Sequence, residues 1–341
     1  MQQISFANAE HLAKKRVTRR EHFLNQMEQV VPWARLLEAI EPYYPKGHKG
    51  RPPIGLQRML RLYFVQQWFG LSDEGVEDAV SDSAAMRAFV GVDLGQEEAP
   101  DSTTVLKFRR LLENNKLTHA IFEQVNAHLS QQGLMMREGT MVDATIINAP
   151  PSTKNADKAR DADMHQTKKG QQYYFGMKAH IGADVESGLV HSLHTTPANE
   201  SDVAHAHELL HGQEQTVFAD AGYVGVQKRP EVIQAQEAGE IREDVEWNVA
   251  MGRSKLKAMA KGVLKDLTQE IEHLKAQVRA RVEHPFHVVK NLFKHKKTRY
   301  KGLAKNTAQL YTLFGLSNLV IAKKALLAAK SNWALQGTGA S

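Results

Sequence analysis

Cysteine is absent from the 341 residues, which excludes disulfide bonds and thiolate metal sites. Carboxylates, histidines or backbone oxygens must therefore hold any metal ion, and a carboxylate site favours Mg²⁺ or Mn²⁺. A run of eighteen apolar residues and a charged-then-apolar leader are also lacking. We therefore expect no membrane span, no secretion and a cytoplasmic location.

Acidic residues are missing after Glu283, although the segment that follows is strongly basic. Its positive residues are Lys290, Lys294, Lys296, Lys297, Arg299, Lys301, Lys305, Lys323, Lys324 and Lys330. Those ten charges exceed the net charge of +6 of the whole chain, so the remainder is net negative. Such asymmetry favours a polyanionic partner, most plausibly nucleic acid, and the alternative is an ordinary solvated surface.

Residues 1–132 are predicted to form an all-helical domain. A basic arm that includes Lys14, Lys15 and Arg16 leads into a helix at 23–31, which Pro32 interrupts. Further helical periodicity covers 36–40 and 56–64. Start signals at Ser72 and Asp101 open two more helices, the second over 103–113.

The helix at 103–113 carries Thr103, Lys107 and Arg110 along one face and apolar residues elsewhere. A helix that reads a DNA groove has this pattern, and so does an ordinary packing helix. We expect this helical domain to bind DNA.

Residues 133–330 are predicted to form a second domain, with a flexible tail over 331–341. Alternation predicts a strand at 140–147 that directs Asp143 and Thr145 to one face. The other expected elements are strands at 174–184, 188–196, 215–220 and 247–251, helices at 201–211 and 227–238, and a final helix that carries Glu283. A polar loop at 150–172 and a basic linker at 253–265 lie between them. This order predicts a mixed α/β sheet of the ribonuclease H type.

In that topology the strand bearing Asp143 and the strand ending at Asp220 are neighbours, about 4.8 Å apart. Two adjacent carboxylates repel each other unless a cation takes up the charge, and Glu283 supplies a third. The three acids could form a cage for two divalent ions that acts on a phosphodiester. Each acid also has an ordinary alternative, as a strand-end polar residue, a turn former or a salt-bridge partner.

Helical spacing places Arg279, Glu283 and Lys290 on one stripe, beside an apolar stripe that includes Val282 and Phe286. A carboxylate bordered by two cations could hold a metal ion next to an anionic substrate. An ordinary surface salt-bridge stripe is the alternative. Pro285 should kink or restart this helix.

Residues 207–211, His-Glu-Leu-Leu-His, match the zinc-protease pattern, in which a helix places two imidazoles one turn apart. Gly212 ends that helix at once, and no third ligand is evident downstream. We expect His207, Glu208 and His211 not to form a catalytic zinc site, and zinc peptidase activity is kept only as a remote alternative.

The chain resembles bacterial DDE transposases of the insertion sequence five group, within the insertion sequence four/five superfamily. The resemblance is carried by residues 142–146 (Val-Asp-Ala-Thr-Ile), by residues 219–223 (Ala-Asp-Ala-Gly-Tyr), and by the spacing of Arg279, Glu283 and Lys290. Residues 86–89 and 100–104 also resemble the DNA-binding domain of that group.

The resemblance implies a transposase that cleaves DNA at the ends of an insertion sequence and transfers strands into target DNA. It implies Asp143, Asp220 and Glu283 as ligands of two Mg²⁺ or Mn²⁺ ions, with Arg279 and Lys290 near DNA phosphates. Expected partners are double-stranded DNA at the terminal inverted repeats and the target, and a second copy in an active homodimer at the bacterial nucleoid. A DNA-binding regulator derived from a transposase is the alternative.

Overall fold

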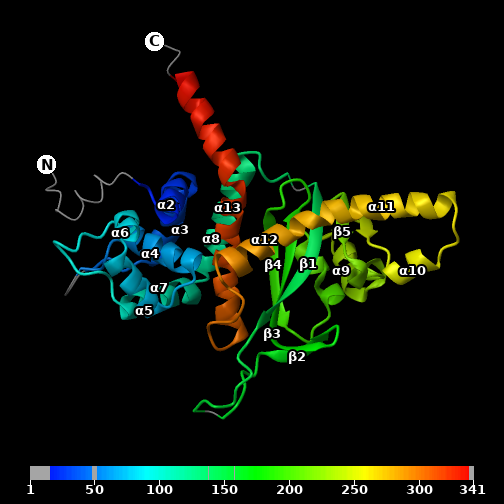
Figure 1. Cartoon of the computed structure of the whole chain (residues 1–341), viewed down its shortest axis with the longest axis horizontal. Helices are drawn as coiled ribbons and strands as arrows, with labels where there is room; N and C mark the ends of the chain where they lie inside the picture. The colour runs from blue at the N-terminus through cyan, green and yellow to red at the C-terminus, as the bar shows by residue number, and fades with distance from the viewer. Residues whose placement is uncertain (1–15, 48–51, 137, 157, 338–341) are drawn as a thin grey trace. The chain divides into compact units, whose positions relative to one another are not determined.

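The computed structural model describes residues 16–47, 52–136, 138–156 and 158–337, and side chains as far as Ser331. Lys14 and Lys15 of the expected basic arm, and the end of the expected tail, lie outside the described residues. Figure 1 shows the elements of two compact units. Unit 1 comprises Met1–His128, Leu292–Lys294 and Gly315–Ser341, and unit 2 comprises Leu129–Asn291 and His295–Phe314. The domain limits expected from the sequence stay predictions.

The N-terminal part of the chain is helical, as expected. Its helices are α2 (Arg19–Val30), α3 (Trp33–Ile40), η1 (Glu41–Tyr43), α4 (Leu56–Phe69), α5 (Asp73–Asp82), α6 (Ala84–Val90), α7 (Ser102–Asn114) and α8 (Leu117–Gln131).

Side-chain caps explain where three of these helices begin. At α2, Thr18 Oγ1 accepts from the backbone N–H of Glu21 at 3.2 Å, and the Glu21 carboxylate accepts from the N–H of Thr18 at 3.4 Å. Ser72 and Asp101 cap α5 and α7 by accepting backbone N–H groups at 2.9 and 2.7 Å. The predicted starts at Ser72 and Asp101 are confirmed.

Aromatic side chains fill the centre of unit 1. Trp68 of α4 lies 5.5 Å from Phe23 of α2 and 5.7 Å from Phe89 of α6, between ring centroids. Trp33 of α3 stacks on Phe64 of α4 at 5.6 Å. Because these edge-to-face and tilted contacts bury large apolar surfaces, they hold the three helices α2, α3 and α6 around α4.

Helix α13 (Leu303–Gly337) bears on the expectation that no segment spans a membrane. Its stretch Leu303–Ser331 is long and apolar enough to cross a membrane by length and composition. However, 56% of the apolar window is buried inside the protein, and the buried Asn318 amide donates to Asn126 Oδ1 of α8 at 2.8 Å. Buried, hydrogen-bonded polar groups of this kind are typical of a core helix.

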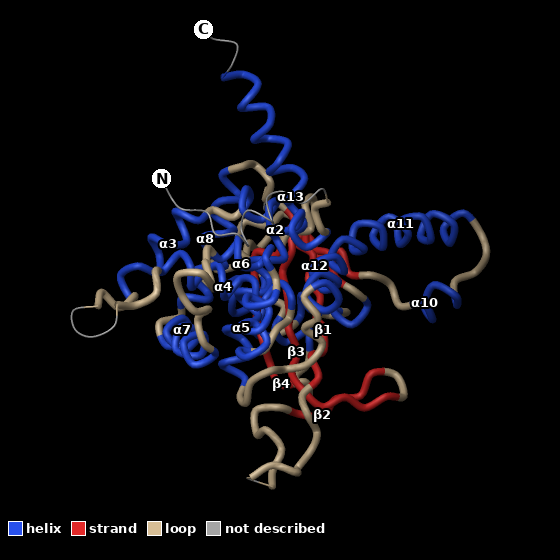
Figure 2. Tube along the Cα trace, turned by 60° about the vertical axis from the view of Figure 1, so that its left-hand side comes forward, coloured by secondary structure: helices blue, strands red, loops and turns tan. Residues whose placement is uncertain are grey.

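The sheet of unit 2, whose strands are red in Figure 2, mixes antiparallel and parallel pairs. Its strands are β1 (Gly139–Asn148), β2 (His165–Lys169), β3 (Gln172–Asp184), β4 (Val190–Pro197), β5 (Thr216–Ala219) and β6 (Glu246–Val249). The order is β2-β3-β1-β5-β6, and β4 also pairs with β3. β3 is antiparallel to β1, β2 and β4, whereas β1, β5 and β6 are parallel. The expected ribonuclease H-like sheet is confirmed.

Helices and short helical turns follow the strands of unit 2. They are η2 (Asp202–His205), η3 (His207–Leu209), η4 (Ala221–Tyr223), η5 (Val226–Lys228), α9 (Pro230–Glu237), α10 (Arg253–Ala258), α11 (Val263–Arg279), η6 (Ala280–Val282), α12 (Glu283–His287) and the π-helical turn η7 (Val288–Leu292). A buried cluster that includes Val142, Leu209, Val217 and Tyr223 joins several of these turns to β1 and β5.

Two expected connections contain regular structure. The polar loop at 150–172 includes β2, which pairs with β3 through a tight turn at Gly170, whose φ is +63°. Because β2 reads His-Gln-Thr-Lys-Lys at the edge of the sheet, it lacks the apolar alternation that would predict a strand. The basic linker at 253–265 contains α10 and the start of α11.

The expected α-helix at 201–211 is wrong. The segment forms the two 3₁₀ turns η2 and η3, and Leu210 is already extended. Ala206 and Leu209 are fully buried, and their three-residue spacing suits a 3₁₀ turn laid against the sheet. Packing against β1 and β5 therefore overrides the local helical pattern.

Alternation along β1 creates two faces with different chemistry. The face that carries Asp143 and Thr145, here called the acid face, meets Lys290, whose Nζ donates to Thr145 Oγ1 at 2.6 Å. The opposite face, here called the histidine face, carries Thr140, whose Oγ1 lies 2.9 Å from His191 Nε2.

Candidate functional site

Asp143 and Asp220 are brought together by the register of two parallel strands. Val142 of β1 pairs with Ala219 of β5, and each aspartate is the residue that follows. Neighbouring strands lie about 4.8 Å apart, so the two carboxylates extend from adjacent positions. The strand adjacency expected from the sequence is confirmed.

Asp220 also ends its strand. Its Oδ1 accepts from the backbone N–H of Gly222 at 2.7 Å and so caps η4. A Cβ on Gly222 would approach Asp220 Oδ1 to 2.8 Å, closer than real Cβ atoms tolerate. The glycine therefore allows the chain to turn tightly around the carboxylate without displacing it.

Asp143 carries the most informative electrostatic signal in the site. Its pKa is raised to about 6, first by burial and further by the negative charges of Asp220 and Glu283. The backbone N–H of Ala144, which donates to Asp143 Oδ1 at 2.7 Å, and the charge of Arg279 oppose the rise. A buried carboxylate that two others destabilise is suited to a divalent cation, because the cation would favour the ionised form of all three.

Glu283 and Arg279 do not share one continuous helix. Arg279 is the last residue of α11, and Glu283 is the first of α12, with the 3₁₀ turn η6 between them. The helix restarts at Glu283, two residues before Pro285, in line with the expected kink or restart near this proline, and the α-helical geometry is interrupted again at the π-helical η7. Val282 and Phe286 are buried, so the predicted apolar stripe does anchor this segment.

Lys290 is tied directly to β1. Its Nζ donates to Thr145 Oγ1 at 2.6 Å and to the carbonyl oxygen of Ile146 at 2.8 Å. Burial lowers the pKa of Lys290, as does the charge of Lys169, while Glu283 opposes this effect. The ammonium group is therefore held on the acid face, two residues along the strand from Asp143.

Tyr223 is a site residue that was not predicted from the sequence. The side chain is 1% exposed, and its hydroxyl has no hydrogen-bond partner among the described residues. Burial raises the pKa of Tyr223 well above its usual value, and so do the negative charges of Asp202, Asp143 and Asp220. The only signal in the sequence was its place in the 219–223 motif, directly after the turn that Asp220 caps.

The basic residues after Lys290 fall into two kinds. Lys294, Lys296 and Lys297 are exposed, whereas Arg299 is half-buried. Lys297 forms a parallel bridge with Asn148, which places it at the end of β1. Next to it lies a groove of about 540 Å³, lined by the end of β1 and its flanking loop, by Arg160 and by aromatic side chains of β3.

Helix α7 presents the residues expected to contact DNA. Thr103, Lys107 and Arg110 are exposed, while Val105 and Phe108 are buried. The predicted polar and apolar faces are therefore present on this helix.

The zinc-protease pattern is not assembled. His207 and Glu208 lie in η3, whereas His211 follows in extended chain. Glu208 contacts His194 and His205, but His211 contacts Glu214. The geometry therefore divides the pattern between two separate groups.

Comparison with known families agrees with this architecture. Residues 135–319 match the family described as Transposase DDE domain, and residues 11–111 match that described as Transposase domain (DUF772). Because the first match spans more than half of the 341 residues, the chain belongs to the DDE transposase family. Enzymes of this family act on DNA by phosphoryl transfer and generally use divalent metal ions.

Proposed function

We propose that this transposase belongs to the insertion sequence five group, and that it cleaves DNA at the terminal inverted repeats of its element and joins the ends to target DNA. The observation that carries the proposal is the strand register that brings Asp143 and Asp220 to adjacent positions, with Glu283 close enough for its charge to help raise the pKa of Asp143 to about 6. These three carboxylates come from separate elements, and their negative charges repel one another. A bound cation would stabilise the ionised form of all three.

Asp143, Asp220 and Glu283 would hold two Mg²⁺ or Mn²⁺ ions, since oxygen ligands suit these hard cations. Such ions activate a water or a 3′-hydroxyl and stabilise the leaving oxygen in an in-line displacement at phosphorus. In cleavage, water attacks the phosphorus and the bond to the 3′ oxygen breaks, which frees a 3′-hydroxyl. In joining, that 3′-hydroxyl attacks a target phosphodiester, whose own bond to the 3′ oxygen breaks and leaves a 3′-hydroxyl on the target strand. The buried hydroxyl of Tyr223, which lies within the electrostatic influence of Asp143 and Asp220, would contribute a hydrogen-bond donor to this site.

Positive side chains would position the DNA. Arg279 and Lys290 border the carboxylates, and their charges suit the phosphates that flank the cleaved bond. Lys296, Lys297 and Arg299 of unit 2, and Lys294 of unit 1, would add further contacts to the DNA phosphates. Thr103, Lys107 and Arg110 of α7 would contact the terminal repeats.

The second copy expected in an active homodimer has a candidate contact on α11. Leu264, Leu267, Ile271 and Leu274 are each more than half exposed and follow three-four-three spacing, typical of a coiled-coil seam. In Figure 2, α11 extends beyond the sheet, with α10 near its far end. An exposed apolar stripe of this kind favours burial against an identical stripe.

The variants Asp143→Asn, Asp220→Asn and Glu283→Gln test the proposal. Each keeps its volume but removes one negative charge, so we expect Mg²⁺-dependent cleavage to fall at least about a thousandfold. Binding of end DNA should be unchanged or tighter, because negative charge beside the phosphates is lost. Gel shifts and cleavage of the same labelled end measure both quantities.

Glu237→Gln, an exposed acid of α9, is the matched control and should keep wild-type cleavage. A folded acid variant that retains substantial cleavage would remove that residue from the proposed site. A wild-type protein that binds the ends but never cleaves them would instead support a DNA-binding regulator.

A further inference from the structure

A regular pattern of histidine and glutamate occupies the connection between β4 and β5. His205, Glu208, His211 and Glu214 follow one another at every third position. β4 supplies two more imidazoles, and the six side chains form two groups. The first is His191, His211 and Glu214, and the second is His194, His205 and Glu208.

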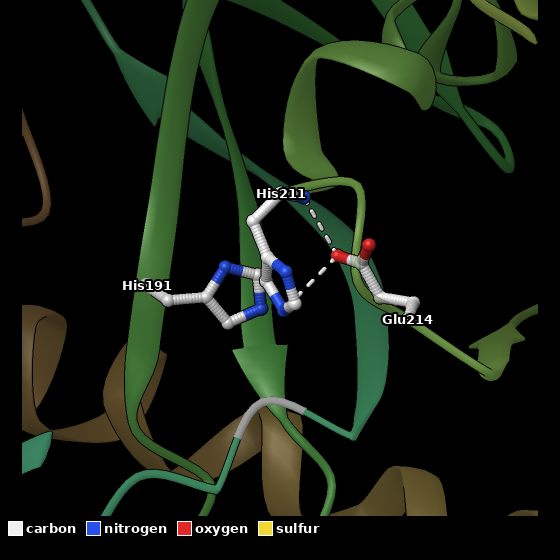
Figure 3. A group of neighbouring side chains, drawn as sticks. All are labelled: His191, His211 and Glu214. Carbon is white, nitrogen blue, oxygen red and sulfur yellow. Dashed lines mark hydrogen bonds and ion pairs between the residues drawn. The ribbon is translucent and has the colours of Figure 1, made fainter. Parts of the chain in front are cut away.

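The first group is compact and converges on one carboxylate (Figure 3). Glu214 Oε1 accepts from the backbone N–H of His211 at 2.7 Å and lies 3.3 Å from His211 Nε2. The rings of His191 and His211 are 4.8 Å apart between centroids. One potential ligand atom from each of the three residues lies within 4.8 Å of the other two.

The second carboxylate oxygen of Glu214, Oε2, is the strongest sign of a bound cation. The residue is 1% exposed, and its Oε2 has no hydrogen-bond partner among the described residues. A buried carboxylate oxygen without a partner is strongly unfavourable. A cation held between this carboxylate and the two imidazoles would remove that penalty.

The second group makes a weaker case for a metal ion. Both carboxylate oxygens of Glu208 already face imidazoles, Oε2 that of His194 and Oε1 that of His205, the latter at 3.2 Å. The Glu208 side chain is also 33% exposed, so water can solvate it. Glu208 therefore provides a matched comparison for Glu214.

We propose that His191, His211 and Glu214 bind one transition-metal ion of the zinc class. Two imidazoles and a carboxylate are ligands that suit Zn²⁺ and are unlike an all-oxygen site for Mg²⁺. The hydroxyl of Thr140, 3.1 Å from Glu214 Oε1 and 2.9 Å from His191 Nε2, orients two of the ligands. On the histidine face, the ion links the β4–β5 connection directly to β4, and through Thr140 to the start of β1.

The test uses the full-length chain, stripped with a chelator and titrated with Zn²⁺ against a competing indicator. Wild-type protein should bind zinc with one tight site per chain, and its melting temperature should rise on loading. Glu214→Gln should weaken that site by more than about a hundredfold, since loss of a direct ligand exceeds the 10–100-fold effect of outer partners. Glu208→Gln should keep both the affinity and the temperature shift.

If Glu214→Gln does not fold by circular dichroism, His191→Gln on β4 replaces it, with the same loss expected. Substitution with Co²⁺ adds a direct readout, because removing an imidazole should change the visible spectrum of the bound ion. Wild-type protein without a tight zinc site would overturn the proposal, and so would undiminished affinity in the ligand variants. Because no DNA is present, the result is independent of the proposed transposase activity.

Discussion

Two carboxylates on opposite faces of β1 show how neighbours decide what a buried acid can do. On the acid face, Asp143 meets the like charges of Asp220 and Glu283, and its pKa rises to about 6. On the histidine face, Glu214 meets two imidazoles and the hydroxyl of Thr140. The first environment suits hard divalent ions bound by oxygen alone, and the second suits an ion that also accepts nitrogen.

Metal exchange should separate the two faces most clearly. After complete chelation, addition of Mg²⁺ or Mn²⁺ alone should restore DNA cleavage by about a thousandfold or more, because these ions supply several kcal/mol of transition-state stabilisation. One equivalent of Zn²⁺ alone should restore thermal stability without cleavage. Cleavage of labelled ends and a melting curve, measured on the same samples, decide the matter. Full cleavage with one equivalent of Zn²⁺ would abolish the distinction between the faces.

Stability in the absence of metal should respond with opposite sign on the two faces. The pKa of Asp143 is about 6 when folded and 3.8 in its ordinary state, so the folded protein binds more protons between these values. The free energy of unfolding therefore falls as pH rises from about 4 to about 6, and stays lower above that range. Asp143→Asn should raise it by about 2 to 3 kcal/mol at pH 7.5 and have little effect near pH 4.

Glu214→Gln should instead lower metal-free stability by about 1 kcal/mol, because the hydrogen bonds that Glu214 Oε1 accepts from the His211 N–H and the Thr140 hydroxyl lose their charged acceptor. Urea unfolding of both variants at the two pH values provides the comparison. A stability gain for Asp143→Asn that is equal at pH 4 and pH 7.5 would show that burial of charge is not its cause.

The smallest expected effect is on DNA affinity and comes from lysines that form hydrogen bonds on the two faces. Lys290 bonds to β1 on the acid face, whereas Lys178 of β3 donates to the carbonyl oxygen of Glu200 at 2.6 Å and pairs with Asp202. Lys290→Met should lower end binding severalfold and reduce the slope of log affinity against log salt by about 1, as expected for one lost phosphate contact. Lys178→Met should leave this slope unchanged. Equal slopes for both variants would remove Lys290 from the DNA surface.

The sequence by itself determined the features that depend on near neighbours. Caps at Ser72 and Asp101 specify where α5 and α7 begin, because each side chain bonds to an N–H group three residues away. Alternation along β1 specified that Asp143 and Thr145 share a face. The mixed sheet also followed from the order of its strands.

Only the tertiary structure decided how distant segments complete the two faces. Tyr223 shares a buried cluster with Val142 of β1 and so feels the charge of Asp143, and nothing local to either residue encodes that proximity. The helical pattern at 201–211 failed because burial of Ala206 and Leu209 against the sheet outweighs helix propensity. The same packing separates Glu208 from His211 and brings His211 and Glu214, which are three residues apart in the chain, to His191 of β4. The proximity of His191 to this pair does not depend on local spacing in the chain.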